Sequence, residues 1–302
     1  MQKKKISFVF FGSGPVAAES LRLLADSFTI EAVVTKPTTK QQMSEVLPGV
    51  EVHCVSDKNE LDALFTTNLF TSQLGVLIDF GIIVSNKIID YFEYKIINSH
   101  FSLLPELRGA DPISFAILEG KEKTGVSLMQ LVEAMDEGPI VSIAEHELDG
   151  TESTPELTQS LITLSNTLLQ NSIPAYLAGD IESVDQNFIE NKFNRKPSYT
   201  RKLTKADGLI DWNKPAHQLE REIRAFAGWP KSYTTLNEID CVITNVSILD
   251  ASGTPGSLFI QNKKLCVYCM DGALQINTIK PAGKKEMDSE GFLAGYKERL
   301  GL

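Results

Sequence analysis

The segment that most restricts the fold lies near the amino end, where an apolar run meets a glycine turn. The apolar run is Ile6–Phe11, the turn is GSGPVA at 12–17, and Ala18–Leu24 is typical of the start of a helix. A short run without polar alternation is typical of a strand whose two faces are both covered, as in a parallel sheet with helices on each side. We therefore expect an α/β protein with a Rossmann-like sheet.

The same turn has the spacing G-x-G-x-x-A of dinucleotide-binding proteins, so a dehydrogenase has to be considered. The next predicted strand, Ile30–Thr35, is followed by Lys36 and Pro37, with no acid to hold a ribose 2′-hydroxyl. Lys36 leaves an NADP variant open. We favour the simpler interpretation, in which the glycines only allow the turn to form.

Three polar residues further along the chain are candidates for chemistry. The run 95–97 predicts a strand that ends at Asn98, so Asn98 and His100 should lie at its carboxyl end, where ligands bind in open α/β sheets. Residues two apart on an extended segment face the same side, so both side chains can point at one small group while Ser99 faces away. Asp136 follows a second predicted strand, Val126–Leu131, in a loop at a sheet edge.

An Asn, a His and an Asp without a serine or cysteine nucleophile suit a reaction in which one bound substrate attacks another. Acyl transfer of this kind passes through an oxyanion, which the Asn98 amide and a protonated His100 can stabilise. Asp136, if it lies near His100, would favour the imidazolium and take the proton from an attacking amine. The alternative is a core histidine and an ordinary loop aspartate, which the whole pattern disfavours.

Around these residues the sequence resembles a known family, the folate-dependent formyltransferases. The matching motifs are NSH at 98–100, SLLP at 102–105, RG at 108–109, TGVSLMQL at 124–131 and MDEGP at 135–139. The members that act on methionyl-tRNA resemble it most. The resemblance implies formyl transfer from 10-formyltetrahydrofolate to the α-amino group of methionine on the initiator tRNA. It also implies that Asn98, His100 and Asp136 are the catalytic residues.

The resemblance further implies which residues contact the folate co-substrate. These lie in a Pro-containing turn and in a segment that offers backbone groups to the pterin ring: Ser102, Leu103, Leu104 and Pro105, and Phe80, Gly81 and Ile82. Asp79, just before the second segment, is unusual for the family, and we assign it no role.

The segment 36–50 bears on the acceptor. Its Pro, Gly and polar composition predicts a loop. In the family the corresponding loop is longer, strongly basic and in contact with the acceptor end of the tRNA. Here it holds only Lys36 and Lys40 against Glu45. We therefore expect weaker engagement of tRNA through this loop.

A length of 302 residues suggests two domains. We expect a catalytic domain over 1–190, a linker over 191–203 and a second domain over 204–302, because residues 178–200 are polar and aperiodic. Beyond residue 240 the sequence consists of short alternating runs between Gly and Asn turns. This pattern predicts a small OB-like β-barrel.

The charges separate the same two halves. Residues 1–190 carry 12 Lys and Arg against 27 Asp and Glu, whereas residues 191–302 carry 17 against 12, so the halves have net charges of −15 and +5. Binding of a polyanion is therefore directed to the second half. The segments at 199–212, 220–230 and 280–285 also resemble the second domain of the family members that act on methionyl-tRNA. We expect tRNA contacts from Arg201, Lys202, Lys280, Lys284 and Lys285.

The remaining composition indicates a cytoplasmic protein that does not bind a membrane, and we expect a monomer. With 42% hydrophobic residues, the sequence has no apolar run long enough to span a bilayer. The four cysteines, Cys54, Cys241, Cys266 and Cys269, do not form a disulfide framework. Cys266 and Cys269 lie in a strand-like run without a second pair or a nearby His, so we expect no metal.

Two alternatives stay open. A sugar-nucleotide N-formyltransferase shares the NSH, SLLP and Asp-loop motifs, but the basic second half favours tRNA. A non-catalytic RNA-binding relative would fit the missing basic loop and the acidic first half, but retention of Asn98, His100 and Asp136 speaks against it.

Overall fold

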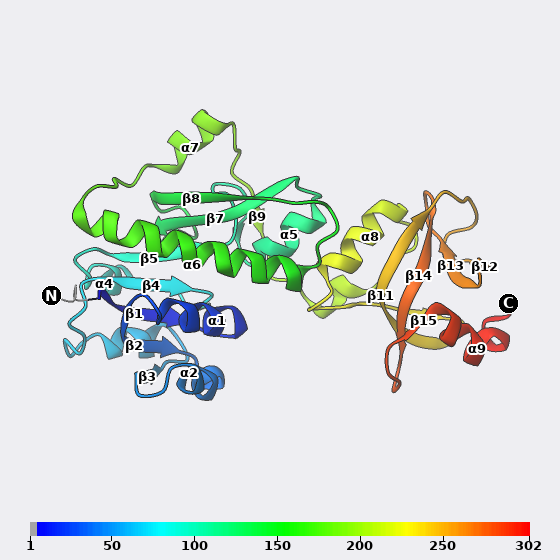
Figure 1. Ribbon diagram of the computed structural model, residues 1–302, viewed down its shortest axis with the longest axis horizontal. Helices are drawn as coiled ribbons and strands as arrows, with labels where there is room; N and C mark the ends of the chain where they lie inside the picture. The colour runs from blue at the N-terminus through cyan, green and yellow to red at the C-terminus, as the bar shows by residue number, and fades with distance from the viewer. Residues whose placement is uncertain (1–4) are drawn as a thin grey trace. The chain divides into compact units, whose positions relative to one another are not determined.

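The computed structural model describes residues 5–302, and its contacts divide the chain into two compact units (Figure 1). The first unit holds the described residues up to Pro112, together with Lys123–Glu147 and Thr158–Thr200. The second holds Ile113–Glu122, Leu148–Leu157 and Arg201–Leu302. Each unit therefore draws on separate stretches of the chain, and the domain limits expected from the sequence stay a prediction.

The first unit is built on a sheet that has seven strands within the described residues. Their order across the sheet is β3, β2, β1, β4, β5, β7, β8, with β3 to β5 parallel and the last two antiparallel. This is a Rossmann-like order, so the α/β prediction is confirmed. The strands are β1 (Ser7–Gly12), β2 (Thr29–Thr35), β3 (Glu51–Cys54), β4 (Gly75–Ile78), β5 (Ile96–His100), β7 (Lys123–Gln130) and β8 (Ile140–Glu147).

The glycine turn after β1 serves packing. The residues from Phe8 to Phe11 are completely buried, as expected for a strand covered on both faces. A Cβ on Gly12 would lie 2.6 Å from the Phe10 ring and 2.8 Å from the carbonyl oxygen of Ile78. Only glycine fits this approach, which accounts for the turn without a bound dinucleotide.

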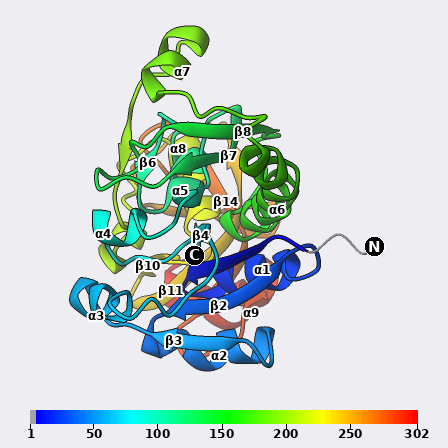
Figure 2. The same cartoon turned by 90° about the vertical axis from the view of Figure 1, so that its left-hand side faces the viewer.

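Helices cover both faces of the sheet (Figure 2). α1 and α6 lie on one side, while α3 and α4 pack their apolar residues against the other. None of the helices within residues 5–302 is both long and apolar enough to cross a membrane. The helices that contribute to this unit are α1 (Pro15–Leu24), η1 (Pro37–Thr39), α2 (Lys40–Val46), α3 (Lys58–Leu64), α4 (Asn86–Ile89), α6 (Thr154–Ala178, from Thr158) and α7 (Gln186–Phe193).

Two segments that were expected to lack regular structure contain helices, and these expectations were wrong. In 36–50, η1 and α2 form because Met43 is completely buried. In 178–200, α7 is preceded by Asp185, whose carboxylate accepts a hydrogen bond from Asn187 N, and is followed by Asn194 with φ 53°. Asp before a helix and Asn after it are ordinary end signals. A further short parallel pair joins β6 (Arg108–Gly109) to β9 (Tyr199–Thr200).

The second unit is rich in β-structure. Its sheet has the order β10, β11, β14, β13, β12, with β15 paired to β14. The helices α8 and α9 pack apolar residues into the same core as the strands. The elements are α5 (Pro112–Leu118, from Ile113), η2 (Lys205–Gly208), α8 (Ala216–Ala225), β10 (Ser232–Leu236), β11 (Ile239–Leu249), β12 (Leu258–Gln261), β13 (Lys264–Tyr268), β14 (Ala273–Pro281), β15 (Met287–Asp288) and α9 (Ser289–Leu300).

This sheet is open as far as the described residues go. β10 and β12 lie at its two edges and do not pair with each other there. A β-rich second domain is therefore confirmed, whereas closure into an OB-like barrel is not.

Candidate functional site

The candidate site begins at the carboxyl end of β5, in the middle of the first sheet. β5 pairs with β4 on one side and with β7 on the other. Asn98 and His100 are each 7% exposed. Ser99 points the other way, where its hydroxyl hydrogen-bonds that of Ser165 in α6 at 2.7 Å. The alternation expected from the sequence is therefore present, with Asn98 and His100 on one face.

The two nitrogens of the His100 ring each face an oxygen atom. Nε2 lies 2.9 Å from the carbonyl oxygen of Leu107. A carbonyl only accepts, so Nε2 carries a hydrogen and donates it. Nδ1 faces Oδ2 of Asp136 at 3.7 Å, which is within ion-pair range when the ring is protonated. The ring is thus oriented by Leu107, and its other nitrogen is directed to the carboxylate.

Asp136 completes the group. Its Oδ2 accepts a hydrogen bond from Gly109 N at 2.7 Å, and its Oδ1 accepts one from Asn98 Nδ2 at 3.5 Å. Its backbone has φ 54°, a left-handed conformation that aspartate tolerates better than most residues. The structure therefore brings together the three residues that the sequence singled out as catalytic, including the pair His100 and Asp136, whose proximity was only an assumption.

The loop that carries Asp136 is fixed by its neighbours. A Cβ on Gly138 would lie 1.8 Å from the carbonyl oxygen of Gln130, so the loop closes tightly against β7 only with glycine there. The buried amide of Gln186 donates to the carbonyl oxygens of Asp136 at 2.7 Å and of Gly138 at 2.9 Å. Sequence reasoning missed Gln186, because no local pattern links it to a loop about 50 positions earlier.

The SLLP turn lies next to β7. The buried Ser127 hydroxyl accepts from Leu104 N at 3.0 Å and donates to the carbonyl oxygen of Ser102 at 2.8 Å. Ser102 and Leu104 expose no surface, so in this conformation they shape the turn without touching a ligand. Leu103 and Pro105 are also buried. Their contact with folate stays a prediction.

The other predicted folate segment follows β4. Phe80 points into the core, whereas Gly81 is exposed and Ile82 is partly exposed. Just before them, Asp79 has φ 48°. Its side chain is exposed by surface area, but nearby protein displaces part of the water around the carboxyl group, and this desolvation raises the pKa of Asp79. The charge of Lys36 opposes the shift, and that of Asp111 adds to it. Asp79 is therefore a polar feature of this end of the sheet, to which sequence reasoning gave no role.

The residues predicted to contact tRNA all lie in the second unit and are all exposed: Arg201, Lys202, Lys280, Lys284 and Lys285. Arg201 forms a two-pronged ion pair with Asp207, at 2.9 and 2.5 Å. That guanidinium, together with Thr204, holds the pKa of Asp207 well below its usual range. Arg201 is thus already paired within its own unit.

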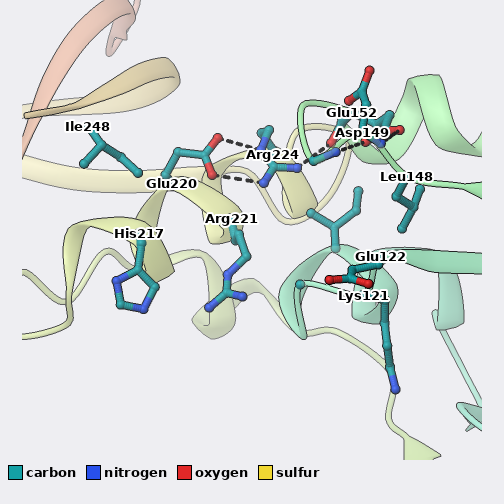
Figure 3. A pocket seen from close by; sticks show the side chains of 13 residues that line it. Lys121, Glu122, Leu148, Asp149, Glu152, His217, Glu220, Arg221, Arg224 and Ile248 are labelled. Carbon is teal, nitrogen blue, oxygen red and sulfur yellow. Dashed lines mark hydrogen bonds and ion pairs between the residues drawn. The ribbon is translucent and has the colours of Figure 1, made fainter.

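The second unit also has a pocket of about 380 Å³ that sequence reasoning missed (Figure 3). Arg224 is paired with Glu220 and donates to the carbonyl oxygen of Glu152. Figure 3 shows His217 and Arg221 pointing to another side of α8. The Nε of Arg221 is buried without a hydrogen-bond partner among the described residues. The pocket is lined by both acidic and basic side chains, so its charge does not select one kind of ligand. No group of residues within 5–302 is arranged to hold a metal.

Comparisons with known proteins cover both units. A formyl transferase family model matches residues 12–173, and a model of the formyl transferase C-terminal domain matches residues 202–297. The chain is 30% identical to a methionyl-tRNA formyltransferase of Listeria monocytogenes, over 97% of this chain and 96% of the relative. It is 31% identical to a methionyl-tRNA formyltransferase of Bacillus licheniformis, with the same coverage.

Solved structures resemble the fold at lower identity. An N-formyltransferase from Helicobacter canadensis, in complex with folinic acid and dTDP-3-aminofucose, has a TM-score of 0.67 and 17% identity over 91% of this chain and 99% of that one. HypX from Aquifex aeolicus, in complex with tetrahydrofolic acid, has a TM-score of 0.65 and 14% identity over 97% of this chain. The chain spans about half of HypX, 48% of its length. At these identities the likeness is one of fold.

Proposed function

The chain belongs to the formyl transferase family, and from this premise we propose that it transfers a formyl group from 10-formyltetrahydrofolate to the amino group of methionyl-tRNA. The observation that carries the proposal is the similarity over 97% of the chain to relatives named methionyl-tRNA formyltransferase. It is supported by the convergence of Asn98, His100 and Asp136 at the end of β5. The initiator tRNA is the proposed acceptor.

In the proposed mechanism the amine of the acceptor attacks the formyl carbon directly. The carbonyl oxygen becomes an oxyanion, which accepts hydrogen bonds from Asn98 Nδ2 and from Nδ1–H of the protonated His100 ring. Nδ1 is the nitrogen available for this, because Nε2 donates to Leu107. Asp136 takes the proton of the attacking amine, directly or through a water. Collapse of the intermediate breaks the bond from the formyl carbon to the folate nitrogen, and this nitrogen leaves with the proton that Asp136 took from the amine, returned directly or through a water.

Donor binding is proposed for the two segments beside this group. The turn Ser102–Pro105 shapes one wall, held by the Ser127 hydroxyl. The segment Phe80–Ile82 offers backbone groups at its exposed positions, Gly81 and Ile82. No metal takes part in the proposed reaction.

We propose a catalytic domain over 1–190, a linker over 191–203 and a second domain over 204–302. The acceptor would bind to the second domain and to the end of the linker. Lys280, Lys284 and Lys285 would contact phosphates, together with Lys202 and, once released from Asp207, Arg201. Whether the second sheet closes into an OB-like barrel does not affect this proposal. We further propose that the protein acts as a monomer in the cytoplasm.

A sugar-nucleotide acceptor is the second candidate. It is favoured by the segment 36–50, where α2 takes the place of a long basic loop and only Lys36 and Lys40 supply positive charge. The basic residues of the second unit favour tRNA instead. The sugar nucleotide therefore stays an outcome of the test.

The proposal is tested by formylation of methionyl-tRNA with the wild-type protein, His100→Ala and the double variant Lys284→Gln/Lys285→Gln. We expect His100→Ala to lose turnover by about 10² or more, because an oxyanion donor is removed. The double variant should weaken tRNA binding. It should also lower the slope of log K against log salt by about 0.9 per lost phosphate contact. An unchanged turnover in His100→Ala would refute the mechanism, and an unchanged salt slope would remove the two lysines from the interface.

A further inference from the structure

One side of α7 is anchored to the candidate active site. Gln186, in its first turn, donates to the carbonyl oxygens of Asp136 and Gly138 and accepts from the guanidinium of Arg108. Ile189, one turn later, packs in an apolar cluster with Leu104 of the SLLP turn. The position of α7 is therefore set by the same loop and turn that are proposed to hold the reactants.

The other side of α7 carries aromatic and basic residues. Phe188 is 53% exposed and Phe193 is 51% exposed, whereas the other phenylalanines in residues 5–302 are less exposed. The ammonium of Lys192 lies 5.4 Å from the centroid of the Phe188 ring and 5.3 Å from that of Phe193. The guanidinium of Arg195 lies 5.2 Å from the Phe193 ring. We name these four residues the α7 platform.

The platform is open to a partner. Figures 1 and 2 both show α7 beyond β8, outside the sheet and its covering helices. Arg195 is paired with Glu145, and the neighbouring Lys196 is paired with Glu190. Lys192 has no ion pair with any described residue. Lys192 is therefore the cation of the platform that is available to an anionic ligand.

Exposed rings with cations above them suit single-stranded nucleic acid. Bases stack on aromatic side chains whatever their identity, and neighbouring cations hold the phosphates. The sequence that follows Phe188 agrees, because residues 191–206 contain six Lys and Arg and no Asp or Glu, directly after a strongly acidic first half, 1–190. A double-stranded acceptor stem has no free base faces, so the chemistry selects a single strand.

We propose that the α7 platform binds the single-stranded 3′ end of the RNA acceptor, with bases stacked on Phe188 and Phe193 and a phosphate at Lys192. The assignment of this RNA as the acceptor rests on the proposed function, whereas binding of single-stranded RNA does not. The amino acid is attached to that 3′ end. A strand held on α7 would therefore deliver the reacting amine beside the Asp136 loop, to which Gln186 ties the helix.

The first test is fluorescence anisotropy with a labelled single-stranded RNA hexamer, against a blunt RNA duplex of equal length. We expect the hexamer to bind more tightly than the duplex. Phe188→Leu and Phe193→Leu should each weaken hexamer binding about tenfold, since the ring is lost and apolar bulk is kept. Phe188→Tyr should bind as the wild type does, and so should Leu69→Ala, which changes an exposed apolar residue elsewhere in the first unit.

The second test is the salt dependence of the same binding. Lys192→Gln should lower the slope of log K against log salt by about 0.7, as for one phosphate contact on a single strand. Lys87→Gln, a change of an exposed lysine in α4, should leave the slope unchanged. In formylation assays, Phe188→Leu should raise KM for methionyl-tRNA and leave kcat and the KM for the folate donor unchanged.

The outcomes separate this inference from the proposed function. If methionyl-tRNA is formylated but Phe188→Leu changes neither KM nor hexamer binding, the platform is refuted and the function stands. If hexamer binding is lost in Phe188→Leu but methionyl-tRNA is not formylated, the platform stands and the function is refuted. Equal binding of hexamer and duplex, or a wild-type dimer that dissociates in Phe188→Leu, would also overturn the platform.

Discussion

Replacement of Asp136 by asparagine removes one negative charge from the candidate site and little else. The carboxylate lies 3.7 Å from Nδ1 of His100, and its side chain is 13% exposed. Asn keeps an oxygen that accepts from Gly109 N, and it tolerates the left-handed backbone at this position. Asp136→Asn should therefore fold as the wild type does.

The expected effect on rate follows from the lost charge and the lost base. Two unit charges at about 4 Å attract by roughly 1–4 kcal/mol between bulk water and a partly desolvated site. That corresponds to about 5- to 1,000-fold in rate if the ion pair exists only with the protonated ring of the transition state. A positioned general base contributes about 10²–10⁴-fold. We expect kcat for Asp136→Asn to fall by about 10²–10⁴-fold.

The assay is single-turnover formation of the formylated product with both substrates saturating. Glu137→Gln is the matched control, because Glu137 is the next residue of the same loop but pairs with Arg108 at 3.2 Å and not with His100. It should keep kcat within about threefold. A value for Asp136→Asn that is also within about threefold of the wild type would refute the assigned role.

Three further predictions concern the support of the site. Gln186→Leu removes the amide that accepts from the Arg108 guanidinium and donates to two carbonyl oxygens of the Asp136 loop. The free energy of unfolding measured in urea should therefore fall by about 2–4 kcal/mol, and an unchanged midpoint would contradict the anchoring role. Ser127→Ala should raise the Kd for tetrahydrofolate in titrations, by an amount equivalent to about 1–3 kcal/mol, because Leu104 N loses its acceptor; Ser165→Ala, a buried change on the far side of β5, should not. Burial raises the pKa of Cys241 to about 12 and of Cys269 to about 11, so both stay protonated thiols at pH 8. Mass spectrometry after alkylation should therefore find Cys54, which is only partly buried, modified before them. Early labelling of Cys269 would contradict its burial.

The local part of the site could be predicted from the sequence, because it depends on residues that are neighbours along the chain. Two apolar residues followed by N-x-H predict a buried strand with both polar side chains on one face, and β5 has this arrangement. The glycine turn after β1 similarly predicts a strand packed closely against a helix. Both features depend on neighbours in the sequence, which a single chain displays directly.

The long-range part could not be predicted in the same way. His100 and Asp136 lie close together because β7 pairs with β5 and the loop after β7 closes tightly at Gly138. Neither the pairing nor the loop closure can be read from the sequence around His100, 36 positions before Asp136. Gln186 and Arg221, whose Nε has no hydrogen-bond partner among the described residues, were missed because their surroundings come from distant segments. α2 and α7 were missed for another reason: their polar composition outweighed the end signals at Asp185 and Asn194 and the single buried Met43.

The central claim is tested most directly by a competition for the formyl group. The purified protein is given 10-formyltetrahydrofolate with methionyl-tRNA and a panel of amino-sugar nucleotides, and each product is quantified. We predict that methionyl-tRNA is formylated and that the sugars are not. Formylation of a sugar nucleotide alone would contradict the proposed acceptor, and no transfer to any acceptor would contradict the account of an active enzyme.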